Sequence, residues 1–162
     1  IKNFQDIVFL IVGDGTRKIE AENLIENMKL KNVILLPPLP REKYPLVLHS
    51  SDISLVTLIK ELKTPVVPSK ILSIMSAGKP VVAAMNKDGD APKLIENAKC
   101  GFAVDAGDAE GLAKAILQLY NSEELRKEFG KSGRKYVEEH LSAKKAAERY
   151  EKLFIRLIEN KK

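Results

Sequence analysis

The sequence has few of the residues from which disulfides, metal centres and aromatic binding platforms are built. Its 162 residues include one cysteine, Cys100, two histidines and no tryptophan. A single cysteine excludes an intrachain disulfide and suits a reducing cytoplasm. Two histidines and one cysteine are too few for the usual structural zinc sites, so we expect no metal centre.

Long apolar runs and one-sided charge are also missing. No apolar stretch approaches the roughly 18–20 residues that span a bilayer. The net charge is +5, but the basic residues of the C-terminal third alternate with acidic ones, as on a solvated helix face. Aromatic residues make up 6% of the chain and do not interleave with the basic ones. This pattern argues against a nucleic-acid partner.

The sequence offers no recognisable hydrolytic or dinucleotide-binding machinery. It contains no nucleophile–base pair and no paired carboxylates, so hydrolysis is not supported. Gly13-Asp14-Gly15 opens like a dinucleotide fingerprint, but the third glycine is replaced by Lys18. A nicotinamide- or flavin-binding domain is therefore not indicated.

What the sequence does contain is an alternation of short apolar runs with amphipathic segments. The expected strands are Asp6–Val12, Asn32–Leu36, Asp52–Val56, Pro80–Ala84 and Gly101–Val104. The expected helices are Arg17–Lys29, Arg41–His49, Ser69–Ala77, Ala91–Ala98 and Ala109–Tyr120, followed by a helical tail with breaks near Asn121, Gly130 and Leu141–Ser142. Strands that are apolar throughout indicate a sheet covered on both faces. We therefore predict an α/β fold, a Rossmann-like doubly wound parallel sheet of about five strands with a helical C-terminal tail.

In such a sheet, ligands bind at the carboxyl ends of the strands. The turn Gly13-Asp14-Gly15 follows the first expected strand and opens a helix, so its backbone could approach a ligand. A tight turn with no ligand remains the alternative. Asn86–Asp90 also lies at this edge, as a binding loop or as a solvated turn.

Pro68-Ser69-Lys70 is the more informative segment. We expect Ser69 to cap the helix and the free N–H groups of the first turn to face a phosphate. Lys70 is a cation at the end of the helix where cations are unfavourable, which an anionic ligand would explain. The alternative is that Lys70 projects into solvent. The long loop Thr57–Val67, with Lys60, Glu61 and Lys63, is the expected wall of a sugar pocket.

Six segments in this order carry a family resemblance. They are IVGDG (Ile11–Gly15), VILLPPLP (Val33–Pro40), SSDISLV (Ser50–Val56), PSKILSIMSAGKPVVAA (Pro68–Ala84), GFAVDAGDAEGLAKAI (Gly101–Ile116) and the helical tail Arg126–Tyr150. With them the chain resembles the C-terminal domain of the group 1 (family 4) retaining glycosyltransferases, which have the GT-B fold. The Pro-Ser-Lys form resembles the subgroup that builds bacterial and archaeal surface polysaccharides.

The resemblance implies a donor-binding site. Gly13, Asp14 and Gly15 would approach the donor diphosphate, and Pro37 and Pro38 would border the nucleobase. Ser69 and Lys70 would meet phosphate or ribose. The family usually carries two glutamates eight positions apart, and here those positions are Pro65 and Ser73. Ser73 would replace the ribose-binding carboxylate with a weaker hydroxyl contact.

The resemblance also implies what surrounds the domain. Residues 1–162 would be the donor-binding domain. The chain would be a fragment that lacks the acceptor domain, the catalytic group, and the first strand and helix of the donor-binding domain itself. Such a fragment would be inactive alone. The substrate would be a nucleoside-diphosphate sugar, with UDP expected before GDP. No cofactor or metal would be needed, because the helix start and lysines would stabilise the leaving diphosphate.

The acceptor would be a polysaccharide or a lipid-linked saccharide. We expect a cytoplasmic protein, or one at the inner face of the membrane through peripheral association. Two alternatives stay open: a non-catalytic Rossmann-like binding or scaffold domain, favoured by the lost glutamates, and a nucleotide-sugar epimerase, whose acid–base residues are missing.

Overall fold

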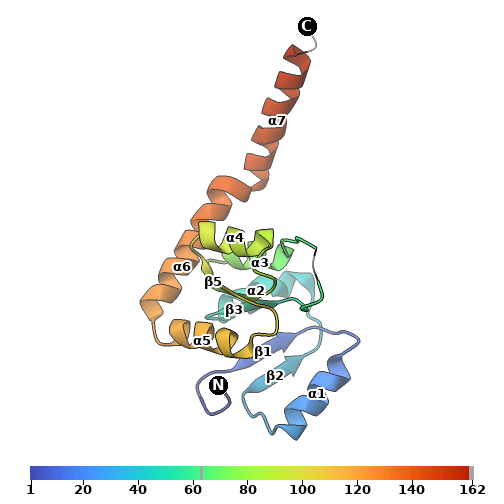
Figure 1. Ribbon diagram of the computed structural model, residues 1–162, viewed down its shortest axis with the longest axis vertical. Helices are drawn as coiled ribbons and strands as arrows, with labels where there is room; N and C mark the ends of the chain where they lie inside the picture. The colour runs from blue at the N-terminus through green and yellow to red at the C-terminus, as the bar shows by residue number, and fades with distance from the viewer. Residues whose placement is uncertain (63, 161–162) are drawn as a thin grey trace. The chain divides into compact units, whose positions relative to one another are not determined.

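The structure is a computed structural model that describes residues 1–62 and 64–160, in two units of the chain. Unit 1 is Ile1–Val47 and unit 2 begins at Leu48 (Figure 1). Lys63, part of the predicted pocket loop, lies outside the described residues. Each unit is built around its own parallel sheet.

Unit 1 contains a two-stranded parallel sheet and one long helix. Strands β1 (Phe9–Val12) and β2 (Val33–Leu36) pair along their whole length and are joined by α1 (Lys18–Asn27). The predicted first strand is too long at its start. The side-chain amide of Asn32 donates to the carbonyl of Ile7, so the backbone ladder starts only at Phe9.

The predicted helix Arg41–His49 is divided in two. A 3-10 turn, η1 (Arg41–Lys43), leads into α2 (Tyr44–Ser50). Pro45 lies in the first turn of α2, where its missing N–H has no helical partner to lose. The position of the proline thus follows the prediction, and the helix itself is shorter.

Unit 2 contains a three-stranded parallel sheet in the order β3 (Ser54–Thr57), β4 (Val81–Ala84), β5 (Gly101–Val104). Figure 1 shows α3 (Ser69–Ser76) and α4 (Asp90–Asn97) on one face of this sheet and α5 (Ala109–Tyr120) on the other. The predicted α/β class with parallel strands and flanking helices is confirmed. The described residues form five strands, divided between two sheets rather than joined in one.

The central strand β4 explains why unit 2 is covered on both faces. Every residue of β4 is buried, and alternate side chains of a strand point to opposite faces. Val81, Ala83 and the following Met85 join the core under α3 and α4. Val82 and Ala84 face the opposite side, where α5 packs against β4. A strand between two helical layers must be apolar at every position, as the sequence of β4 is.

The helical tail consists of α6 (Glu123–Tyr136), a π-helical turn η2 (Val137–Leu141) and α7 (Ala143–Glu159). The breaks predicted near Asn121 and Leu141–Ser142 are confirmed, and Ser142 caps α7 by accepting a hydrogen bond from the Lys145 N–H. The break predicted at Gly130 is wrong. Gly130 lies inside α6 and brings its bare backbone against Gly78, at the end of α3.

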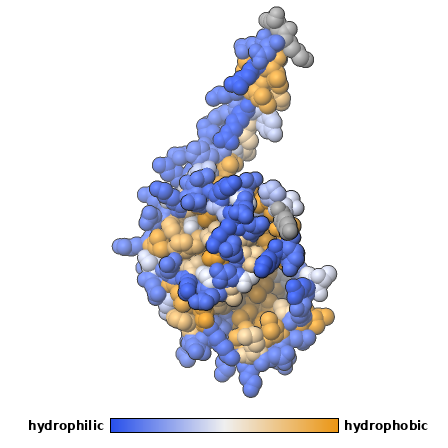
Figure 2. Space-filling view, viewed as in Figure 1, coloured by the Kyte–Doolittle hydropathy of each residue, from blue (hydrophilic) through white to orange (hydrophobic). Residues whose placement is uncertain are grey.

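Helix α7 is amphipathic and buries none of its residues. Figure 2 shows its apolar side chains as an exposed patch beside hydrophilic ones. The large apolar residues of this patch are Tyr150, Leu153, Phe154, Leu157 and Ile158. Neither α7 nor any other helix of the described residues combines the length and apolarity needed to cross a membrane.

Candidate functional site

In unit 1 the two strands bring Gly13 and Pro37 to the same edge of the sheet. The Gly13 N–H donates to the carbonyl of Leu36, at an N···O distance of 3.1 Å, and Pro37 follows Leu36 directly. Gly13 has φ +146°, a conformation that strains any residue with a Cβ. Asp14 accepts a hydrogen bond from the Gly15 N–H through its own carboxylate, at 2.9 Å. The predicted turn is therefore held by its own backbone and one carboxylate.

Of the two cations at the start of α1, Arg17 is paired with a carboxylate, whereas no ion pair holds Lys18 within the described residues. Arg17 precedes α1 and donates from Nε to a carboxylate oxygen of Glu20, at 2.7 Å. This hydrogen bond and the charge of Arg17 lower the pKa of Glu20, and both side chains are exposed. An anion at the turn could therefore meet both backbone N–H groups and the Lys18 ammonium.

In unit 2 the carboxyl ends of all three strands lie at one edge. The Leu58 N–H donates to the Ala84 carbonyl at 2.9 Å, and the Met85 N–H donates to the Val104 carbonyl at 3.0 Å. The loops after these strands therefore start side by side. An ion pair between Lys87 and Asp105, 3.0 Å between Nζ and Oδ2, joins the second loop to the third.

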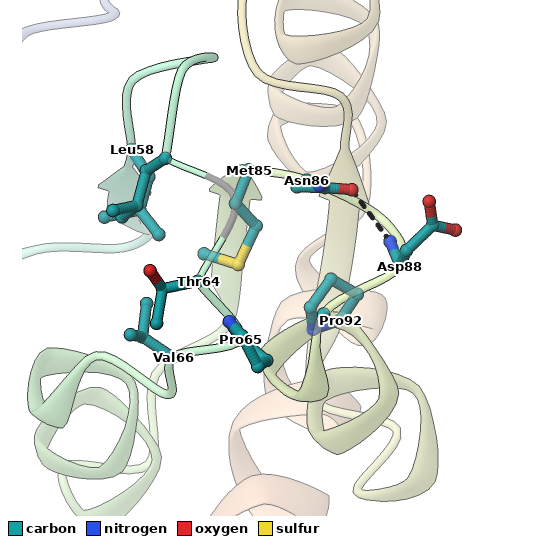
Figure 3. A pocket seen from close by; sticks show the side chains of 10 residues that line it. Leu58, Thr64, Pro65, Val66, Met85, Asn86, Asp88 and Pro92 are labelled. Carbon is teal, nitrogen blue, oxygen red and sulfur yellow. Dashed lines mark hydrogen bonds between the residues drawn. The ribbon is translucent and has the colours of Figure 1, made fainter.

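Two of these loops enclose a cavity of about 210 Å³ (Figure 3). One wall is lined by Leu58, Leu62 and Thr64–Val66, and the other runs from Met85 through Asn86 to Pro92 at the start of α4. The predicted loop is thus a cavity wall, and Pro65 lies in it. Met85 directly follows a buried strand and precedes Asn86–Asp90, which was expected to be a binding loop or a solvated turn.

The start of α3 differs from the prediction in one respect: Ser69 does not cap it. Pro68 occupies the capping position and no side chain accepts a hydrogen bond there. A serine caps from the non-helical position before the helix, whereas Ser69 is already its first helical residue. The Ile71 N–H donates to the Pro68 carbonyl, at 2.9 Å. The N–H groups of Ser69 and Lys70 therefore have no side-chain acceptor among the described residues.

Ser69, Lys70 and Ser73 lie on the first turn and a half of α3, away from its buried residues. The Ser73 hydroxyl donates to the Ser69 carbonyl one turn earlier, at 3.4 Å. Lys70 is exposed, and within residues 1–62 and 64–160 no carboxylate pairs with it. The structure thus gathers these three predicted residues on one helix of unit 2, and Gly13, Asp14, Gly15, Pro37 and Pro38 on one sheet edge of unit 1.

The described part of the chain holds no cluster of three or more histidine, cysteine, aspartate or glutamate side chains that could bind a metal ion. Cys100 is buried in the core of unit 2, and burial raises the pKa of its thiol to about 12. The thiol is therefore protonated at neutral pH and does not serve as a nucleophile.

Comparison with known proteins gives one family. The family described as "Glycosyl transferases group 1" matches residues 1–136. The N-acetyl-alpha-D-glucosaminyl L-malate synthase of Bacillus anthracis is 26% identical over 157 residues, 97% of this chain and 39% of the relative. The poly(ribitol-phosphate) alpha-N-acetylglucosaminyltransferase of Staphylococcus aureus is 29% identical over 160 residues, 95% of this chain and 30% of the relative. The chain thus spans about a third of the length of these curated relatives.

Solved structures agree on the fold. The S. aureus protein TarM, in a mutant form bound to fondaparinux, alpha-GlcNAc-glycerol and UDP, matches with a TM-score of 0.73 and 26% identity, over 91% of this chain and 29% of that one. HepE of Anabaena, in complex with UDP, matches with a TM-score of 0.79 and 21% identity, over 94% of this chain and 42% of that one. The second likeness is one of fold alone.

Proposed function

Because this chain belongs to the group 1 glycosyl transferases, we propose that it is the donor-binding domain of a retaining enzyme that takes a sugar from a nucleoside diphosphate. The family match over residues 1–136 is the observation that carries this proposal. The acceptor is a polysaccharide or a lipid-linked saccharide, held with the catalytic group in a further domain. No residue of this chain is assigned a catalytic role.

The start of α3 is the proposed diphosphate site. Its first N–H groups have no side-chain acceptor, and they carry the positive end of the helix dipole. Lys70 adds a full charge that no carboxylate of the described residues neutralises. Hydrogen bonds from N–H groups to an anion contribute about 1.5–3 kcal/mol each, so two of them and one lysine together supply about 5–9 kcal/mol towards the cost of association. No cofactor or metal ion is needed for this role.

The edge of the sheet in unit 1 is proposed, by itself, to contact a donor phosphate and a nucleobase. Gly13, Asp14 and Gly15 form a turn whose backbone is open to a phosphate, because no heavy atom would meet a Cβ built at Gly13 or Gly15 within 4 Å. Pro37 and Pro38 are exposed next to this turn, where their carbonyl groups can accept from a nucleobase. A base that carries a donor at its Watson–Crick edge, such as uracil, fits this role.

UDP is the proposed nucleotide because TarM, 26% identical to this chain, was solved with UDP. Isothermal titration calorimetry of the 162-residue chain with UDP, GDP and ADP tests the proposal. We expect binding that is tightest for UDP and about tenfold weaker in Lys70→Ala. Lys131→Ala, which removes an exposed lysine from α6, is the matched control and should bind as the unmodified chain does. Failure of all three nucleotides to bind would reject a donor-binding role.

A scaffold role is the second candidate, and one observation favours it. Pro65 and Ser73 stand where the family usually has glutamates, so two carboxylates that grip the donor are missing. A scaffold domain binds none of the three nucleotides, and Lys70→Ala then changes nothing. The same titration therefore separates the two candidates.

A further inference from the structure

We propose that the cavity between the loops after β3 and β4 is a sugar pocket selective for a 2-acetamido sugar, a selectivity that rests on the donor-binding function proposed above. Its volume of about 210 Å³ is below the roughly 300–1,000 Å³ of pockets for drug-sized ligands, so it holds one substituted ring and not a whole nucleotide sugar. The nucleotide part of the donor must lie elsewhere.

The cavity lies next to the proposed diphosphate site along the chain. Val66 lines the cavity, and only Val67 and Pro68 separate it from Ser69, the first residue of α3. A diphosphate held by the N–H groups of Ser69 and Lys70 therefore leaves its attached sugar within reach of this cavity. The order of the two sites along one loop matches the order of the two groups in a sugar nucleotide.

The walls of the cavity present apolar and polar atoms in about equal measure, and the apolar part comes from both sides. Leu58, Leu62 and Val66 line one side, and Met85 and Pro92 line the other. Figure 3 shows the Met85 side chain reaching between the two walls, and Met85 is 1% exposed, so its position is fixed by the core beneath it. A methyl group entering this space can pack against apolar side chains of both walls.

The side-chain amide of Asn86 is held in place by a hydrogen bond from the backbone. The Asn86 side-chain oxygen accepts a hydrogen bond from the Asp88 N–H, at 3.0 Å, which leaves the Asn86 NH₂ group as a donor. Figure 3 shows the Asp88 carboxylate directed away from the cavity. Asp88 is the one charged side chain among the described lining residues.

These features fit an acetamido group better than a hydroxyl group. The acetamido methyl can pack against the apolar wall while its carbonyl accepts from the Asn86 NH₂ or the Thr64 hydroxyl. A hydroxyl group at the same carbon has neither the methyl group nor the carbonyl group that make these two contacts. One buried methyl group and one net hydrogen bond together correspond to about a tenfold preference.

Calorimetry with UDP-N-acetylglucosamine and UDP-glucose tests this selectivity, with UDP as the reference ligand. We expect the acetamido donor to bind about tenfold more tightly than the glucose donor. Val66→Asn places a polar group in the wall and should abolish the difference while leaving UDP affinity unchanged. Val67→Asn is the matched control, since Val67 is 40% exposed against 36% for Val66 and does not line the cavity.

Nuclear magnetic resonance with N-acetylglucosamine-1-phosphate and glucose-1-phosphate reports on the cavity without the nucleotide. A preference for the acetamido compound that disappears in Val66→Asn supports the proposed selectivity of the cavity, even if UDP fails to bind. In that case only the proposed nucleotide binding is rejected. Binding of UDP with equal affinity for both sugar nucleotides overturns the selectivity and leaves the donor-binding function standing. Loss of the preference in Val67→Asn as well as in Val66→Asn would also overturn it.

Discussion

Replacing Gly130 by alanine tests the contact that holds α3 in place. A glycine in the middle of a helix is normally a weak point, and alanine there stabilises by about 1 kcal/mol. At Gly130 we expect the opposite. A Cβ built there lies 2.1 Å from the Gly78 carbonyl oxygen, and ordinary contacts begin at 3.4 Å. The two backbones would have to separate by 3.4 − 2.1 = 1.3 Å, and neither can rotate away as a side chain could.

The size of the effect follows from two opposing contributions. Overpacking a tight contact costs about 1–3 kcal/mol, and a clash between backbones belongs at the upper end of that range. After subtraction of the gain in helix propensity, about 2 kcal/mol of destabilisation remains. For a chain of this length that lowers Tm by roughly 4–8 °C. Thermal unfolding followed by far-UV circular dichroism measures the shift directly.

Gly111→Ala is the matched control, in the first turn of α5. Its Cβ would lie 2.2 Å from an oxygen of the Asp108 side chain, which can rotate away. The change weakens the cap that Asp108 provides to the Gly111 N–H, worth about 1 kcal/mol, and gains about as much helix propensity. We expect a Tm within about 3 °C of the unmodified chain. A Gly130→Ala variant as stable as this control would refute the close approach of α6 to α3.

Three further outcomes follow from the structure. Cys100 should resist iodoacetamide at pH 8 until the protein is unfolded. At that pH a thiol with a pKa of about 12 is ionised in only about one molecule in ten thousand, whereas a thiol with the ordinary pKa of 9.0 is ionised in about one in ten. Labelling of the folded chain, measured by mass spectrometry, would contradict the burial of Cys100. Truncation after Ser142 removes α7, which buries no residue, and should therefore shift the Tm measured by circular dichroism by less than about 2 °C. A larger fall in Tm would show that α7 packs on other elements of the chain. Asn86→Ala should weaken binding of the acetamido donor about threefold to tenfold in calorimetry. Asp88→Ala keeps the backbone N–H that holds the Asn86 side chain, so it should leave the affinity for this donor unchanged. Equal effects of the two changes would contradict a contact between Asn86 and the sugar.

The elements of unit 2 were predictable because their signals are local. The strand expected at Pro80–Ala84 is observed at Val81–Ala84, and the helix expected at Ala109–Tyr120 has those bounds. The first strand shows what composition cannot decide. Ile7 and Val8 are as apolar as the strand that follows, but the Ile7 carbonyl accepts from the Asn32 side chain, so the ladder ends there. The extent of a strand depends on its partner, which lies elsewhere in the chain.

Gly130 failed as a helix break for a related reason. Its low helix propensity costs about 1 kcal/mol, which tertiary packing easily exceeds. Here the missing side chain is what lets α6 approach Gly78. The pocket was only half predictable in the same sense. The loop after β3 was expected to form a wall and Asn86–Asp90 to be a binding loop or a solvated turn, but no local signal says that these two loops face one another across one cavity.

The error at Ser69 bears on the proposed site. A serine that capped α3 would hold its first N–H groups itself, and a phosphate would have to displace that hydroxyl. With Pro68 at the capping position, the ring fixes the entry of the chain and offers no acceptor, so those N–H groups have no side chain to satisfy them. Such a helix start is less stable alone and better suited to an anion, since a ligand supplies the missing cap. Pro68→Ser should therefore stabilise the free chain by about 1 kcal/mol and weaken UDP binding, and a variant that improves both would contradict the proposed role of α3.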